Sequence, residues 1–229
     1  MRYAYYPGCS LTGSAQRLDK GVRKVFAKLG HELAEIPDWN CCGAFEFGDR
    51  GALVELSKKN LEKSSSLNVT ERGVVAPCPA CYKNLKEADQ KKTHAIYHPL
   101  EVLSDEVTGS LPVEKDLGGQ VFTPYYGCLL MRPDETAISD KEVMERFIAR
   151  LGGELFGEKV RSKCCGGNQF FINKWATEKL SQIVLKGSKG TIVVFCPLCH
   201  MALTSFSKNR KIIYFTDLLL YTMGERQTL

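Results

Sequence analysis

Hydrophobic residues recur along the chain at two spacings, one typical of amphipathic helices and the other of short buried strands. Leu18, Val22 and Val25 lie at helical spacing, so the sequence predicts a helix here. Gly30 follows it in the position where a glycine commonly terminates a helix. In the first half we expect strands near residues 2–6, 31–36, 73–76 and 95–97, and further helices over residues 53–61 and from residues 79 and 100.

The second half repeats this order of elements. It predicts strands near residues 121–125, 154–156, 191–195 and 211–215, and helices near residues 140–151, 175–186, 198–205 and 217–223. Strands that alternate with helices favour parallel strand–helix–strand units. The run Ile-Val-Val-Phe at residues 192–195 is apolar throughout, which is typical of a strand covered on both faces.

Short motifs also recur in the same order in the two halves. Tyr5-Tyr6-Pro7-Gly8-Cys9 returns as Tyr125-Tyr126-Gly127-Cys128, Cys41-Cys42-Gly43 as Cys164-Cys165-Gly166, and Cys78-Pro79-Ala80-Cys81 as Cys196-Pro197-Leu198-Cys199. Every cysteine belongs to this scheme, so duplication of one unit explains the pattern. The predicted fold class is α/β, with two tandem parallel-sheet repeats related by a pseudo-two-fold axis. We expect repeats at residues 1–107 and 120–229, joined by a glycine-containing linker at residues 108–119.

Composition excludes several classes of protein. Hydrophobic residues make up 44% and charged residues 25% of the 229 residues, which is typical of a globular protein. The net charge of +5 is small and spread along the chain, so no nucleic-acid partner is expected. No stretch approaches the roughly 18 apolar residues of a membrane helix, and no signal peptide is recognisable. We expect a cytoplasmic protein that does not span a membrane and that would meet one through a partner complex.

The ten cysteines point to a metal site. They are too few for a disulfide scaffold, which has roughly 8–10% cysteine, and thiols stay reduced in the cytosol. Each cysteine group follows a predicted strand. In a parallel sheet these points share the edge where the carboxyl ends of the strands meet, and ligands of open α/β folds bind there. The five cysteines of each half are therefore expected to converge at this carboxyl edge.

Several kinds of site use cysteines, and they differ in how many they need. A structural zinc ion takes four ligands, and the adjacent Cys41 and Cys42 are poorly placed for tetrahedral chelation. A thioredoxin-like role for either Cys-x-x-Cys motif leaves three cysteines unexplained. Disulfides would be a product of air oxidation, and in metal-free protein we expect Cys78 and Cys81 to be able to form one. Iron–sulfur ligation by thiolates is the remaining interpretation.

The two Cys-Cys-Gly blocks, each with an upstream cysteine and a downstream Cys-x-x-Cys, resemble the cysteine-rich CCG-domain family. Residues 5–10 and 38–44 are similar in particular to the B-type and B-like subunits of heterodisulfide reductase. The resemblance covers essentially the whole chain. It implies one non-cubane 4Fe–4S cluster in each half, held by five thiolates. The implied ligands are Cys9, Cys41, Cys42, Cys78 and Cys81 for one cluster, and Cys128, Cys164, Cys165, Cys196 and Cys199 for the other.

This resemblance implies an oxidoreductase component that reduces or forms a disulfide, or a sulfur-carrier thiol bond, between the two clusters. It implies a thiol or disulfide substrate, and as partners a flavoprotein A-type subunit and a C-type subunit with cubane iron–sulfur clusters. The alternative hypothesis is an electron-transfer iron–sulfur subunit of a lactate- or succinate-oxidising type of complex. A zinc-stabilised interaction module is a third hypothesis.

A few other residues could serve the predicted sites. His200 follows Cys199 and could donate a proton to sulfur, although a structural role is favoured, as it is for His31, His94 and His98. Arg161 and Lys163 could bind an anion, but a solvated face is favoured. Four aromatic residues near the Cys-Cys-Gly blocks could exclude water or simply pack in the core: Trp39, Phe45, Phe170 and Phe171.

Overall fold

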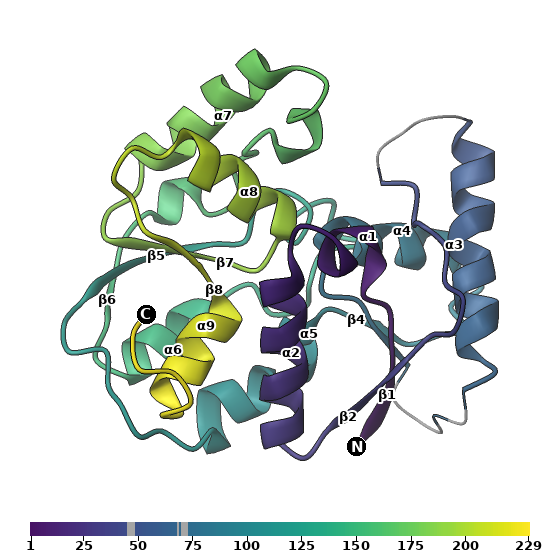
Figure 1. Cartoon of the computed structure of the whole chain (residues 1–229), viewed down its shortest axis with the longest axis horizontal. Coiled ribbons are helices and arrows are strands. Elements are labelled where there is room, and N and C mark those ends of the chain that lie inside the picture. The colour runs from purple at the N-terminus through teal and green to yellow at the C-terminus, as the bar shows by residue number, and fades with distance from the viewer. Residues whose placement is uncertain (45–48, 68, 70–72) are drawn as a thin grey trace.

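The first half of the chain is a four-stranded sheet with helices around it (Figure 1). The computed structural model describes residues 1–44, 49–67, 69 and 73–229. In this half the strands are β1 (Arg2–Tyr5), β2 (Glu32–Glu35), β3 (Val74–Val75) and β4 (Ile96–Tyr97). The helices are α1 (Gly8–Thr12), α2 (Gln16–Lys28), α3 (Arg50–Ser64), α4 (Pro79–Ala88) and α5 (Pro99–Val102), followed by a π-helical turn at Glu106–Ser110.

The second half has the same succession of elements. Its strands are β5 (Val121–Tyr125), β6 (Glu154–Leu155), β7 (Thr191–Val194) and β8 (Ile212–Tyr214), and its α-helices are α6 (Val143–Arg150), α7 (Lys174–Lys186), α8 (Pro197–Phe206) and α9 (Phe215–Thr222). Short 3-10 turns lie at Glu158–Val160 and Gly167–Gln169. Every strand expected from the sequence is present, with ends that differ by at most one residue.

The two sheets have the same strand order. The first runs β2-β1-β3-β4 and the second β6-β5-β7-β8, and every pairing in both is parallel. The registers correspond as well, because Val75 and Val193 each lie three residues before a Cys-x-x-Cys motif and pair with Tyr5 and Pro124, respectively. The predicted α/β class with two similar parallel halves is therefore confirmed. In each sheet the second strand lies on one side of the first strand in the chain, and the third strand lies on its other side. This reversal of strand order is the switch point at which open parallel sheets bind ligands.

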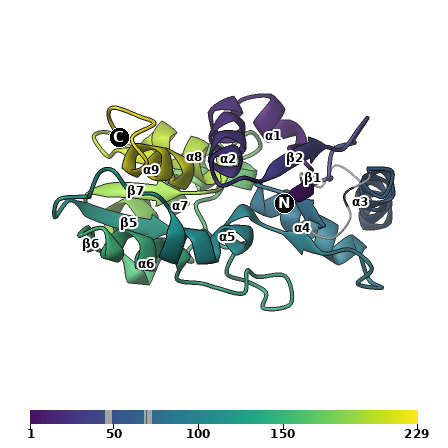
Figure 2. The same cartoon turned by 90° about the horizontal axis from the view of Figure 1, so that it is seen from below.

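Equivalent helices of the two repeats lie on opposite sides of their sheets in the view of Figure 2. Figure 2 shows α2 above the first sheet and its counterpart α6 below the second. The helices α8 and α9 lie on the upper side of the second sheet, and α4 and α5 lie on the lower side of the first. This arrangement is the one expected for two repeats related by a pseudo-two-fold axis.

The two halves share one core and contact each other through matching elements. Helix α2 packs on α9, and a side chain at Gly21 would begin 2.6 Å from the Thr216 hydroxyl. At the end of this contact the Arg17 guanidinium bonds both carboxylate oxygens of Asp217, at 3.1 and 2.9 Å. On the other side of the axis the backbone N–H of Ser139 donates to the Glu101 carboxylate at 3.2 Å.

The segment between the repeats packs against the second half. The π-helical turn Glu106–Ser110 contacts α6, and the side chains of Leu111 and Leu117 are buried. The backbone N–H of Leu117 donates to the carbonyl of Leu151 at 2.9 Å. The glycine-rich part of this segment therefore lies along the surface of the second repeat.

Candidate functional site

The five cysteines of the first half gather at the carboxyl edge of the first sheet. Cys9 lies in α1 directly after β1, and Cys41 and Cys42 follow β2. Cys78 is the N-cap of α4, and Cys81 lies in the first turn of that helix. The sulfur atoms of Cys9 and Cys41 are 4.0 Å apart, and those of Cys42 and Cys81 are 3.2 Å apart. Residues that are far apart in sequence are thus brought together by the parallel sheet.

The second half repeats the arrangement at the edge of its own sheet. Cys128 follows β5, Cys164 and Cys165 follow β6, and Cys196 and Cys199 stand at the start of α8. The sulfur atoms of Cys165 and Cys199 are 3.3 Å apart. The backbone N–H groups of Gly166 and Gly167 point at the sulfurs of Cys164 and Cys165, each at 3.3 Å. All ten cysteines are free thiols.

Burial gives each cysteine group an inner and an outer side. The inner cysteines are Cys42, Cys78, Cys81, Cys165, Cys196 and Cys199, and all of them are buried. On the outer side, Cys9 and Cys41 are exposed, whereas Cys128 and Cys164 are half-buried. The first group is therefore more open to solvent than the second.

A glycine precedes the first cysteine of each group and leaves space for a sulfur. Gly8 and Gly127 have φ angles of 68° and 75°, in the left-handed region that favours glycine. A side chain at Gly8 would begin 2.8 Å from the Cys81 sulfur, and one at Gly127 would begin 3.1 Å from the Cys199 sulfur. Any larger residue would displace these sulfurs or the backbone beside them.

A buried tyrosine holds the Cys-Cys-Gly loop of each half. The Tyr6 hydroxyl donates to the Asn40 carbonyl at 2.5 Å, and the Tyr125 hydroxyl donates to the Lys163 carbonyl at 2.6 Å. Asn40 and Lys163 each directly precede a Cys-Cys-Gly block. The structure therefore pairs Tyr6 with Tyr125, one residue away from the pairing that the Tyr-Tyr motifs predict. The cause is Pro7, which has no counterpart between the second tyrosine pair and Cys128.

Buried polar side chains from the following helices anchor the same loops. Ser57 in α3 donates to the Cys42 carbonyl at 3.3 Å, and Ser181 in α7 donates to the Cys165 carbonyl at 2.9 Å. The amide of Asn84 also donates to the Cys42 carbonyl, at 2.8 Å. These residues were not predicted from the sequence. The available signal was a serine in the inward face of each helix.

The close thiols move each other's pKa values apart. The pKa of Cys41 is lowered, chiefly by its contacts with Cys42 and Cys9, and that of Cys164 is lowered by its contact with Cys128. The Gly166 N–H and the Arg132 guanidinium lower the pKa of Cys164 further. The pKa of Cys9 is raised, first by its contact with Cys41 and then by burial. Full ionisation of such a group requires a bound cation, because adjacent thiolates repel one another.

The donor set fits a group held by thiolates. In the described part of the chain, no three His, Cys, Asp or Glu side chains have the geometry to hold a single metal ion. The sulfurs lie in close pairs instead, and five are available in each half. Thiolates are soft ligands that select iron–sulfur clusters, zinc or copper(I). The space reserved beside Gly8 and Gly127, and the N–H groups aimed at sulfur, are consistent with a cluster wider than one ion.

The structure also shows where the other residues considered from the sequence lie. The His200 ring stacks on Tyr214, with centroids 4.2 Å apart, and burial lowers its pKa. Arg161 pairs with Glu145 at 3.4 Å, and the Lys163 side chain is exposed. Trp39 packs edge-on against Tyr6. Phe170 contacts Phe206, Phe171 is exposed, and Phe45 lies outside the described residues.

A cleft between the two halves opens onto the second cysteine group. It has a volume of about 190 Å³ and is lined by all five cysteines of that group. Its opposite wall comes from the first half and includes Pro79, Ala80 and Lys83 of α4. In addition, α1, which carries Cys9, contacts α8, which carries Cys199. Each half thus lies against the cysteine-bearing helix of the other.

This fold and site define a duplicated parallel α/β protein with a five-thiol site at the switch point of each sheet. The profile of the cysteine-rich domain (CCG) family matches residues 3–86 and 122–204. The chain belongs to this family, and both repeats carry its domain.

Similar proteins include redox subunits and iron–sulfur proteins. The chain is 23% identical to the 8-methylmenaquinol:fumarate reductase membrane anchor subunit of Wolinella succinogenes, over 92% of this chain and 84% of that protein. It is 24% identical to uncharacterized iron–sulfur proteins of Methanocaldococcus jannaschii and Methanococcus maripaludis, of which it spans only 44% and 40%.

A crystal structure of a hypothetical protein from Helicobacter pylori shares the fold. Its TM-score is 0.69 at 12% identity, over 98% of this chain and 49% of that one. None of the helices that the structure describes is both long and apolar enough to cross a lipid bilayer.

Proposed function

We propose that the chain is an iron–sulfur subunit of an oxidoreductase complex, with one non-cubane 4Fe–4S cluster in each repeat. The observation that carries this proposal is the convergence of five thiols at each switch point, including the 3.2 Å approach of Cys42 to Cys81. The proposed ligands are Cys9, Cys41, Cys42, Cys78 and Cys81 in the first half, and Cys128, Cys164, Cys165, Cys196 and Cys199 in the second. The iron–sulfur relatives support the choice of metal.

Several residues of the chain favour the binding of a cluster at these sites. A bound cluster would supply single-electron transfer. Cys41 and Cys164 lie on the outer side of their groups and have lowered pKa values, so they would give up their protons readily. The N–H groups of Gly166 and Gly167 stabilise negative charge on sulfur. Tyr6 and Tyr125 fix the loops that carry the paired cysteines.

The proposed reaction is reduction or formation of a disulfide or sulfur-carrier thiol bond, as in heterodisulfide-reductase-like complexes. The cleft beside Cys128 and Cys164 supports it, because a small thiol can reach half-buried sulfurs there. Disulfide reduction takes two electrons, and the duplication provides two equivalent sites. The proposed partners are a flavoprotein A-type subunit and a cubane iron–sulfur C-type subunit. Residues 1–107 and 120–229 are the proposed repeats.

A second candidate function is electron relay without a disulfide substrate. The Wolinella succinogenes relative favours it, since that protein is named as a subunit of a quinol:fumarate reductase. In that case the two sites would pass electrons between partner subunits. A cytoplasmic location, with membrane association through the complex, suits both candidates.

Two measurements test these proposals in sequence. Protein purified without oxygen should contain about eight irons and acid-labile sulfide, with an electron paramagnetic resonance signal of a thiolate-held cluster. Stoichiometric zinc without iron after anaerobic reconstitution would contradict the iron–sulfur assignment. Turnover of a disulfide by this protein with an artificial electron donor supports the first candidate, and fully loaded protein without such turnover supports the relay.

A further inference from the structure

Four large apolar side chains stand in solvent on and beside α7. The exposed fractions are 75% for Phe171, 67% for Ile172, 68% for Trp175 and 53% for Ile183. We call these four residues the α7 apolar patch. They lie close together in sequence, and large apolar side chains exposed together commonly mark a binding surface.

The helix places part of this patch and a lysine on one outward strip. Trp175, Lys179 and Ile183 are four residues apart, so they follow one another along the same face of α7. The Lys179 ammonium lies 5.6 Å from the centre of the Trp175 ring. The opposite face of the helix buries Thr177, Ser181, Val184 and Leu185 against the protein. The outward strip is therefore free to contact another surface.

Basic side chains surround the patch. Lys174 and Lys186 begin and end α7, and both are exposed. Glu178 is the acidic residue of the helix. The outer face of α7 thus combines aromatic and aliphatic groups with three lysines and one glutamate.

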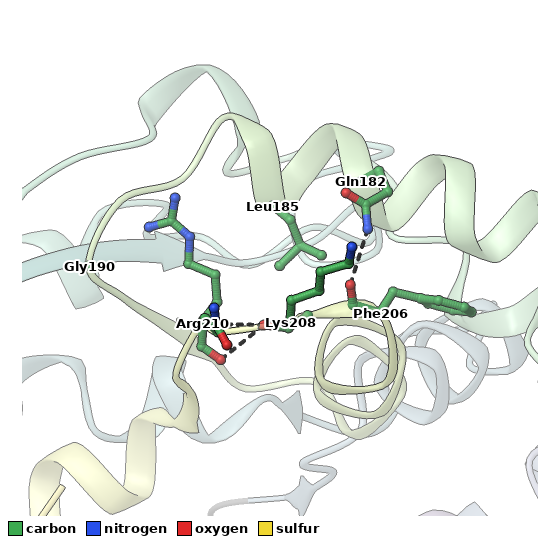
Figure 3. A pocket seen from close by; sticks show the side chains of 8 residues that line it. Gln182, Leu185, Gly190, Phe206, Lys208 and Arg210 are labelled. Carbon is green, nitrogen blue, oxygen red and sulfur yellow. Dashed lines mark hydrogen bonds between the residues drawn. The ribbon is translucent and has the colours of Figure 1, made fainter.

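An open hollow of about 700 Å³ adjoins the C-terminal part of α7 (Figure 3). One wall is formed by Gln182 and Leu185 of α7, and the other by the loop after α8. Figure 3 shows Lys208 and Arg210 extending from this loop into the space beside the helix. Within the described residues, neither side chain forms a salt bridge with a carboxylate. Two cations without carboxylate partners therefore line the hollow.

We propose that this face docks onto a lipid bilayer that contains anionic phospholipids. The α7 apolar patch enters the boundary between headgroups and acyl chains, where Trp and Phe are favoured and lysine stems extend to the water. Lys208 and Arg210 meet lipid phosphates in the hollow. In Figure 1, α7 lies at the upper margin of the molecule.

The chemistry favours a lipid surface over a protein partner. The four apolar side chains are each more than half exposed, and lysines accompany them along the helix. An interfacial helix has this composition, with aromatic and aliphatic anchors beside basic residues. This docking is independent of the proposed redox reaction and would hold for either candidate function.

The test is flotation of the purified full chain with vesicles of phosphatidylcholine alone and of phosphatidylcholine mixed equally with phosphatidylglycerol. We expect partitioning onto the mixed vesicles that weakens in high salt. Lys208→Gln and Arg210→Gln should each lower it about fivefold, and Trp175→Ser should lower it on the order of tenfold. Brominated acyl chains should quench a fluorescence component that Trp175→Phe removes.

Matched variants guard against effects of misfolding. Lys59→Gln on α3 and Val113→Ser remove an exposed cation and an exposed apolar group elsewhere, and both should partition like the unmodified protein. Equal partitioning onto both kinds of vesicle, or onto neither, would overturn the proposal. So would concentration-dependent dimers that Trp175→Ser abolishes, because a second copy would then cover the patch. Binding that inorganic phosphate removes while Trp175→Ser leaves it intact would reduce the site to an anion-binding hollow.

Discussion

The imidazole ring of His98 packs edge-on against the phenyl ring of Phe195, with centroids 4.6 Å apart and planes at 73°. His98 Nδ1 accepts a hydrogen bond from the Leu100 backbone N–H, so Nε2 carries the proton and donates to the Pro77 carbonyl at 3.1 Å. Pro77 directly precedes Cys78, and Phe195 directly precedes Cys196. One buried side chain therefore contacts the chain beside the Cys-x-x-Cys motif of both halves.

This position makes folding stability depend on pH through His98. Burial lowers its pKa to about 3, below the ordinary value, although the hydrogen bond to Pro77 opposes the shift. The unfolded chain therefore binds a proton at a higher pH than the folded one does. The contribution of neutral His98 is complete above about pH 6.5 and is lost as the pH falls, by about 1.4 kcal/mol per unit.

Urea unfolding of the unmodified protein and of His98→Gln between about pH 6.5 and 4.5 checks this prediction. Glutamine can still donate to Pro77 but does not titrate. The free energy of unfolding should therefore fall more steeply with decreasing pH in the unmodified protein. Parallel slopes in the two proteins would contradict the prediction.

We expect the Asp217 carboxylate to contribute strongly to folding stability at the contact between the halves. Its buried carboxylate bonds the Arg17 and Arg226 guanidinium groups and the Tyr214 backbone N–H. Asp217→Ala removes these hydrogen bonds and should lower the free energy of unfolding by about 2 kcal/mol, since Arg17 and Arg226 are partly exposed and water can replace the carboxylate. Asp134→Ala is the matched control, because Asp134 pairs with Lys141 on the surface and its loss should leave the unfolding midpoint unchanged. If the two changes lowered the free energy of unfolding equally, the prediction for Asp217 would be wrong.

Tyr6→Phe and Tyr125→Phe should weaken the Cys-Cys-Gly loops without disturbing packing. Burial raises the pKa of both phenols, so their hydroxyls remain donors. Each change removes one hydrogen bond to a loop carbonyl and should cost about 1 kcal/mol of stability, with faster loss of iron from the same half. The Asn40 carbonyl keeps the bond from the Asn60 amide at 3.0 Å. Within the described residues the Tyr221 hydroxyl donates no hydrogen bond, so Tyr221→Phe is the control. Iron loss that is equal in all three variants would argue against the role of the hydroxyl.

Mild oxidation of metal-free protein with oxidised glutathione should join Cys42 to Cys81 and Cys165 to Cys199. Their sulfurs lie 3.2 and 3.3 Å apart in the reduced chain. Peptide mapping by mass spectrometry identifies the products and also tests the Cys78–Cys81 disulfide expected from sequence. In Cys42→Ala the first bridge should disappear while the second persists. A predominance of bridges within the Cys-x-x-Cys motifs would show that the loops rearrange without metal.

Single cysteine changes should separate the two proposed clusters. Cys42→Ala and Cys165→Ala should each remove about half of the bound iron, because each deletes one buried thiolate from one site. If both sites act on one disulfide, either change should abolish its turnover while the spectrum of the other cluster persists. Ser205→Ala, an exposed change on α8, is the control. Substantial turnover with one intact cluster would favour the relay.

The features that could be predicted from the sequence are those that depend only on which residues are buried and on the parallel direction of the strands. The spacing of Leu18, Val22 and Val25 records the buried face of α2 directly, and all three are buried. The convergence of the cysteines followed from parallel strands, whose carboxyl ends share an edge. The five-residue helix α1 was not predicted, because one turn offers no periodicity to detect.

The remaining features depend on tertiary packing. The bonds from Tyr6 to Asn40 and from Ser57 to Cys42 join residues 34 and 15 positions apart, through polar groups that no local pattern distinguishes. His98 was expected to be structural, and its burial and hydrogen bonds fit that expectation. Its position beside both Cys-x-x-Cys motifs arises only when the two halves meet.

The paired contacts across the pseudo-two-fold axis indicate that the ancestor of this chain was a dimer of single repeats. Asp217 and Glu101 each lie at the third position of the helix after the last strand of their repeat, and each accepts a hydrogen bond from the opposite half. A single repeat carrying such an acid would meet an identical chain twice through the same contact, as symmetric dimers do. Gene duplication would then have joined two protomers that already fitted together, and left each copy free to diverge.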